Sequence, residues 1–238
     1  MKKSHIIIAV IFTLGCLSQV THAFYRFDRT FDTALTPNRE IGEAVIVTWT
    51  IVKDGTPTGT SYIAAGTAPE SDFISVMDER HNVRAADRTA DLTNRNWFQQ
   101  MELGLSYISA KTRISFVYVD YDDGTRVVPS EIVAGKVGKR ADLRVGGLNL
   151  NNSSFIPGGY SGFINEGRVA SVLMNSAYAA YSNPVAIRGV FMHEVGHSLG
   201  LAHSYVDMSV GKSMLGYNAQ GPQSVSYTHL TLPTKRIV

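Results

Sequence analysis

Three histidines and one glutamate fall within eleven residues, and side chains of these types can bind a metal ion and transfer protons. The rest of the chain then has to hold these side chains in position. The segment from His193 to His203 reads His-Glu-Val-Gly-His-Ser-Leu-Gly-Leu-Ala-His. Residues four apart lie on one face of a helix, so His193 and His197 can direct their imidazoles at a single metal ion. Neutral imidazole is a preferred zinc ligand, at roughly 2.0–2.1 Å. The spacing therefore predicts a zinc site on one helix face.

The acidic residue beside the first histidine has a different task. Glu194 follows His193 by one position, which turns it about 100° around the helix axis, so it can reach a zinc-bound water but not act as an equal ligand. Gly200 offers the left-handed backbone that ends many helices, and the reversed chain can bring His203 back as the third ligand. Three protein ligands leave one position open, which is the arrangement of catalytic zinc.

Such a site predicts hydrolysis. Zinc lowers the pKa of its bound water from about 15.7 toward about 7. Glu194 is then expected to accept the proton as general base, while hydroxide attacks a peptide carbonyl, and to return the proton to the leaving amine. Two alternatives stay open: a zinc hydrolase of non-peptide amides, and a secreted non-catalytic zinc-binding module. A structural site closes its fourth position with protein and needs no general base, which disfavours the module.

The extended pattern, with Gly200 and a third histidine after the His-Glu-x-x-His core, resembles that of the metzincin metalloproteases. Ser204 directly follows His203, and the run His-Ser-Leu-Gly-Leu-Ala-His-Ser is most similar to the matrixin branch. Residues 141–147, Ala-Asp-Leu-Arg-Val-Gly-Gly, resemble the Ala-Asp-Ile-Arg-Ile-Gly strand that matrixins carry ahead of their active-site helix. The resemblance covers residues 44–217.

This resemblance implies an α+β fold with a twisted mixed sheet of four to five strands, a backing helix, an active-site helix and a short C-terminal subdomain. It makes Met214 the methionine of the turn beneath the zinc in metzincins. The family places a tyrosine one or two residues after that methionine, where it supports the transition state; Tyr217, three residues after Met214, is the candidate here. The family's substrate pairs with the edge strand of the sheet, and residues 168–175 would be that strand.

Patterning predicts the elements that position these groups. Four strands are expected, over residues 44–52, 113–120, 141–147 and 168–175. A helix is expected over 93–110, with an Asn-, Ser- and Gly-rich loop over 149–162, whereas 71–83 favours neither helix nor strand. The buried stripe of the 93–110 helix comprises Trp97, Phe98, Met101, Leu105 and Ile108.

The active-site helix has readable ends. Asn183 is a good N-cap, Pro184 fits the first helical position, and Gly200 stops the helix. Its expected packing face consists of Ile187, Val190, Phe191, Val195 and Leu199.

Other polar clusters carry weaker signals. The carboxylates of Asp120, Asp122 and Asp123 can bind calcium, since hard cations prefer oxygen ligands; the alternative is an ordinary solvated turn. His22 and His81 lack ligand spacing, and no function is expected for them.

The ends of the chain predict its export. Basic Lys2 and Lys3, an apolar run shorter than the ~20 residues that span a bilayer, and small residues up to Ala23 are typical of a secretory signal peptide. The expected division is therefore signal peptide 1–23, N-terminal arm or short pro-segment 24–43, catalytic domain 44–224 and an unstructured, non-native tail 225–238. We therefore expect the protein to be secreted, either to the extracellular space or to the periplasm. We also expect it to be a monomer.

Composition narrows the partners. The chain of 238 residues carries a net charge of +2, and removing the leader with Lys2 and Lys3 leaves the rest neutral. No basic run is present, so nucleic acid is not an expected partner, and no stable membrane insertion is expected. The only cysteine, Cys16, lies in the leader, so the exported chain is stabilised by packing and metal. A protein or peptide substrate is the expected partner.

Overall fold

A computed structural model of the chain describes residues 32–40, 42–59, 69–129, 133–150, 158–161 and 169–200. The strands are β1 (Val45–Ile51), β2 (Ile114–Tyr118), β3 (Leu143–Leu148), β4 (Gly159–Ser161) and β5 (Val172–Asn175). The helices are α2 (Phe73–Arg80), α3 (Asn96–Ser109) and α4 (Pro184–Ser198), with short 3₁₀ turns η1 (Ala85–Asp87) and η2 (Ala179–Ser182). The predicted leader, His203, Met214, Tyr217 and the 225–238 tail lie outside the described residues.

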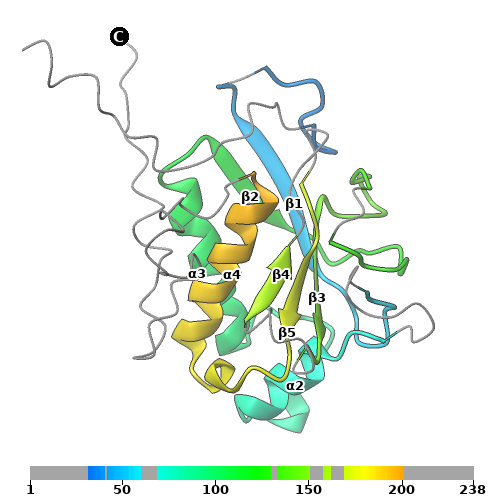
Figure 1. Cartoon of the computed structure of the whole chain (residues 1–238), viewed down its shortest axis with the longest axis vertical. Coiled ribbons are helices and arrows are strands. Elements are labelled where there is room, and N and C mark those ends of the chain that lie inside the picture. Colours follow the sequence, from blue (N-terminus) through cyan, green and yellow to red (C-terminus); the bar gives the residue numbers. More distant parts are fainter. Residues whose placement is uncertain are drawn as a thin grey trace, which may run out of the picture.

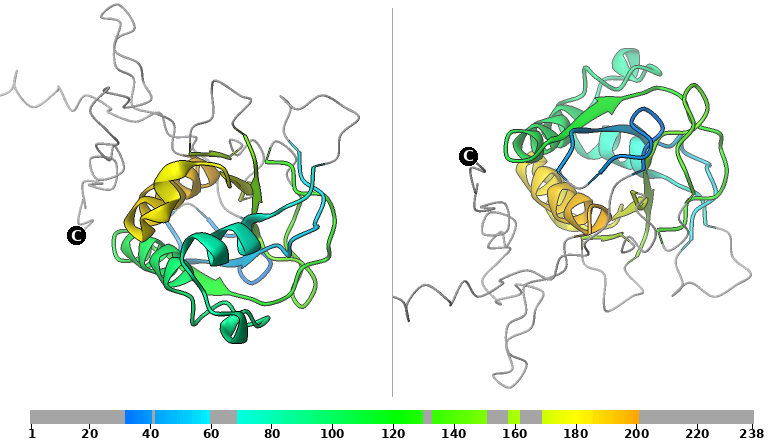
Figure 2. Two further views of the ribbon diagram at one scale, coloured as in Figure 1. Left: turned by 90° about the horizontal axis from the view of Figure 1, so that it is seen from below. Right: turned by 90° about the horizontal axis from the view of Figure 1, so that it is seen from above.

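The five strands form one mixed sheet with the order β2-β1-β3-β5-β4. Four strands run parallel, and β4 pairs with β5 antiparallel. Helices α3 and α4 lie side by side on one face of the sheet, as Figures 1 and 2 show from three directions. The expected α+β domain with a mixed sheet and two major helices is confirmed at this level. None of the described helices has the length and apolarity needed to span a bilayer.

Two expectations about the sheet edge are wrong. Residues 149–162 were expected to be loop, but their last residues form β4. Residues 168–175 were expected to supply the edge strand, but β5 pairs with β3 on one side and with β4 on the other. All four residues of β5 are buried, as suits an inner strand, whereas Gly-Tyr-Ser is too short to show an alternating pattern.

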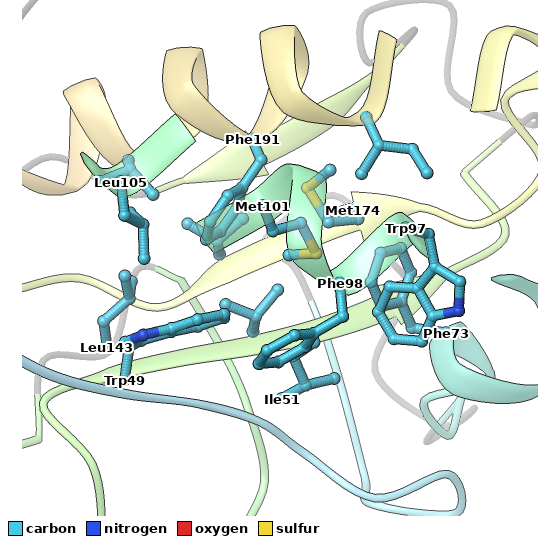
Figure 3. Close-up of a cluster of buried hydrophobic side chains, with 14 of the residues drawn as sticks. Trp49, Ile51, Phe73, Trp97, Phe98, Met101, Leu105, Leu143, Met174 and Phe191 are labelled. Carbon is cyan, nitrogen blue, oxygen red and sulfur yellow. The ribbon is translucent and has the colours of Figure 1, made fainter. Parts of the chain in front are cut away.

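Aromatic side chains join the sheet to the helices (Figure 3). The indole of Trp49 on β1 stacks on Phe98 of α3 with ring centroids 5.2 Å apart, and it lies 5.8 Å from the ring of Phe191 on α4. The whole predicted stripe of α3 is buried. Because one strand side chain touches both helices, the core fixes the position of α4 on the sheet.

Helix α2 fills the segment that patterning left undecided. Its buried face combines Phe73 and Met77 with a carboxylate, Asp78. That carboxylate accepts hydrogen bonds from Arg95 Nε at 2.7 Å and Trp97 Nε1 at 2.9 Å. A buried acid interrupts the apolar period, which explains the ambiguous sequence signal.

The Ala-Asp-Leu-Arg motif at the start of β3 is buried and ties distant segments together. Asp142 accepts hydrogen bonds from the backbone N–H of Ala34 at 2.8 Å and from the backbone and hydroxyl of Thr48 at 2.9 and 2.6 Å. Thr33 also donates its hydroxyl to the carbonyl of Ile46 at 2.8 Å. The described part of the N-terminal arm is therefore attached to β1 through Asp142.

We expect Asp142→Ala to lower the free energy of unfolding by ~3 kcal/mol, because several buried donors lose their acceptor. Urea unfolding of the purified chain measures this change. Asp87→Ala, at an exposed position, is the matched control and should stay within ~0.5 kcal/mol of the parent protein. Equal midpoints for the two variants would contradict the assigned role of Asp142.

The acidic cluster after β2 is an ion-pair network. Arg144 Nε lies 2.6 Å from Asp122 Oδ2, and Arg140 Nε lies 2.7 Å from Asp123 Oδ2. Burial alone would raise the pKa of Asp123, but hydrogen bonds from Arg140 and Thr125 and the charge of Arg140 together hold it well below its usual value. The solvated-turn interpretation is wrong, because guanidinium groups cover these two carboxylates. Both residues belong to the three that were candidates for calcium, and the calcium site itself stays a prediction.

Candidate metal centre

Helix α4 begins and ends where the sequence predicts. The side chain of Asn183 accepts a hydrogen bond from the backbone N–H of Val185 at 3.0 Å, and Pro184 is the first helical residue. At the other end Gly200 has φ +87°, and its N–H donates to the carbonyl of His197 at 2.8 Å. The left-handed glycine therefore ends the helix three residues after the second histidine.

The predicted packing face of α4 holds the helix against the core. Ile187, Phe191 and Val195 are fully buried. Val190 and Leu199 are partly buried and pack against the same cluster. Because this face packs on the core, the rotation of α4 about its own axis is fixed. The directions in which His193, Glu194 and His197 leave the helix are then fixed as well.

The structure brings the first two histidines together. Nε2 of His193 and Nε2 of His197 lie 3.0 Å apart, and the ring planes meet at 89° with centroids 4.6 Å apart. Two nitrogens at ~2.0–2.1 Å from a tetrahedral zinc ion are separated by roughly 3.3 Å. The two nitrogens would therefore have to move apart by only a few tenths of an ångström to bind one zinc ion. The two imidazoles and their spacing fit zinc.

The third ligand is not among the described residues. Within the described ranges, no group of three or more His, Cys, Asp or Glu side chains is arranged to hold a metal ion. His203, the third ligand predicted from sequence, lies beyond them, as do Met214 and Tyr217. The geometry thus supports two ligands, while the third stays a prediction.

Glu194 lies between the histidines in sequence but points into a buried setting. Its side chain is almost fully buried, and burial raises its pKa to about 8, although a hydrogen bond from the backbone N–H of Ser161 works in the opposite direction. A Cβ on Gly159 would lie 2.9 Å from Cγ of Glu194. The carboxylate therefore packs against strand β4.

Sequence reasoning missed this contribution of β4. The only local signal was the small-residue run Gly158-Gly159, which permits close approach of a strand to a helix. A side chain at Gly158 would also collide with α4, since its Cβ would lie 2.9 Å from Cγ1 of Val190. Small residues at both positions let the antiparallel edge strand reach Glu194.

His81, expected to have no metal role, is engaged elsewhere. Its Nε2 lies 2.8 Å from the carbonyl oxygen of Tyr181, an arrangement that joins the end of α2 to η2. Burial lowers the pKa of His81, and the Tyr181 contact partly offsets that effect. This histidine is a useful control for metal binding.

In the metal-free protein we expect Glu194→Gln to raise stability at high pH. The folded-state pKa of about 8 exceeds the usual 4.5, so the folded state binds more protons than the unfolded state between these values, and stability falls as pH rises through that window. Glutamine stays neutral, so the variant should gain at least ~1 kcal/mol at pH ~8.5 and little near pH ~4.5.

Thermal unfolding in excess chelator at both pH values tests this expectation. A difference between variant and parent that does not change with pH would show that Glu194 is not protonated by its buried setting.

Comparisons with known proteins add no family assignment. No protein-family model matches the chain, and no curated protein is significantly similar to it in sequence. The described residues define an α+β domain with a five-stranded mixed sheet, three helices and a histidine pair on α4.

Proposed function

We propose that this protein is a secreted, zinc-dependent endopeptidase of the metzincin kind, closest to the matrixin branch. The observation that carries the proposal is the convergence of His193 and His197 on α4, with Nε2 atoms 3.0 Å apart, beside the buried carboxylate of Glu194. The left-handed backbone of Gly200, with φ +87° at the end of α4, supports it because a glycine at this position is part of the sequence pattern. The five-stranded mixed sheet agrees with the implied fold at the level of its architecture.

In this proposal each residue has a stated task. His193 and His197 hold the ion through Nε2, and His203 completes the ligand set. Zinc bound there supplies Lewis acidity, which polarises a peptide carbonyl and acidifies water. Glu194 takes a proton from the attacking water onto a carboxylate oxygen and delivers it to the nitrogen of the leaving amine.

The direct test is cleavage of a diverse peptide library by the purified chain, with and without a chelator. We expect cleavage at internal peptide bonds that stops with chelator and returns when zinc is added back. Hydrolysis of non-peptide amides without peptide cleavage would support the zinc hydrolase alternative. Zinc binding with no hydrolysis of either class would support a non-catalytic zinc-binding module.

A further inference from the structure

Strand β4 is short and would be held weakly by its ladder alone. It comprises three residues, Gly159–Ser161, and pairs with one neighbour, β5. Nevertheless it carries the backbone N–H of Ser161 that hydrogen-bonds Glu194. Two side-chain hydroxyls from neighbouring elements, those of Ser198 and Tyr181, attach the strand at either end.

The first attachment joins β4 to α4. The hydroxyl oxygens of Ser161 and Ser198 lie 2.8 Å apart, and Ser198 Oγ also lies 3.1 Å from the carbonyl oxygen of Glu194. Ser198 is completely buried, so this hydroxyl pair is shielded from water. It connects the last turn of α4 to the residue whose N–H meets the Glu194 carboxylate.

The second attachment joins β4 to η2. The hydroxyl of Tyr181 donates to the carbonyl of Gly158 at 2.5 Å. Tyr181 is completely buried, and burial, together with the charge of Glu194, raises its pKa well above the usual value, so the hydroxyl stays a donor. This bond fixes the residue at which the chain enters β4.

We propose that Ser198 and Tyr181 are positioning residues that hold the edge strand β4 against Glu194 and so fix the carboxylate of the general base. The inference rests on the proposed function for its catalytic half. Its structural half, the attachment of β4 through two hydroxyls, does not depend on any activity. Neither side chain needs to touch substrate or metal for this role.

Amide hydrogen exchange on the zinc-loaded full chain tests the structural half. Ser198→Ala and Tyr181→Phe each remove one hydroxyl, and we expect the Ser161 amide to exchange ~10-fold faster or more in both. Thr58→Val is the matched control, because it also removes a buried hydroxyl, one that bonds the carbonyl of Pro69 at 2.8 Å away from α4. It should leave Ser161 exchange unchanged. Unchanged exchange in both test variants overturns the proposal.

Kinetics with a cleaved peptide test the catalytic half. A misplaced general base slows the chemical step, so we expect kcat, normalised to bound zinc, to fall ~10-fold in Ser198→Ala and Tyr181→Phe with KM within ~2-fold. Thr58→Val should keep both constants even where it lowers stability. Faster Ser161 exchange with an unchanged kcat would overturn the positioning role.

The two arms also separate this inference from the proposed function. If the parent chain cleaves no peptide, the endopeptidase proposal fails, and exchange of the Ser161 amide still decides whether the two hydroxyls hold β4. If the parent cleaves peptides and neither arm responds to the substitutions, the endopeptidase proposal stands and the inference about Ser198 and Tyr181 is wrong.

Discussion

Glu194→Gln is expected to bind about one zinc ion per chain and to lose peptide hydrolysis by at least ~10²-fold, since general-base help is worth that much or more and the base is not a ligand. The structure makes this a clean substitution. The side chain is buried against Gly159 of β4, and glutamine has the same shape. The fold and the two histidines should therefore be preserved while the proton acceptor is removed.

Zinc content of the dialysed protein and kcat/KM on one peptide measure the two halves of this result. Glu79→Gln, an exposed glutamate on α2, is the matched control and should keep both values. Loss of zinc from Glu194→Gln would mean that the carboxylate is a ligand. Turnover equal to that of the parent would remove Glu194 from the role of general base.

Periodicity predicted the elements that bury one apolar face. The α3 stripe from Trp97 to Ile108 is such a repeated pattern. The strand around Trp49, which is buried on both faces, was predicted instead from its run of β-branched and aromatic residues. Strand β4 has no such pattern, because Gly-Tyr-Ser becomes a strand only through pairing with β5 and packing on α4. Helix α2 was obscured for a different reason, the buried Asp78 in its inner face.

The candidate site also has a part that the sequence predicts and a part that it does not. The pair His193 and His197 could be predicted because their contact is local, four residues apart on one helix. The partner of the Glu194 carboxylate could not, since Ser161 lies on β4 and reaches α4 only in the folded chain, where its hydroxyl also meets that of Ser198, 37 residues away. Long-range partners also turned an apparent surface turn into a buried network, because Asp122 is bound by Arg144, 22 residues away.

The second large effect concerns the ligand that the sequence predicts beyond α4. His203→Ala should weaken zinc binding by at least ~10²-fold, since even residues behind the ligands cost 10–100-fold when they are lost. Of the three predicted ligands, His193 and His197 present two nitrogens 3.0 Å apart, and Gly200 ends α4 with a left-handed backbone. Two imidazoles alone leave a tetrahedral zinc ion short of the three protein ligands of a catalytic site.

His81→Ala is the matched control for this substitution, because it removes an imidazole that contacts the carbonyl of Tyr181 rather than the His193 pair. Competition with a chromophoric chelator gives the zinc affinity of each variant, and the rise in melting temperature on adding zinc gives an independent measure of the same binding. We expect His81→Ala to keep the parent affinity and His203→Ala to lose most of the zinc-dependent rise. Equal affinities for the two variants would place the third ligand at another residue, and the endopeptidase proposal would then need a different donor to complete the site on α4.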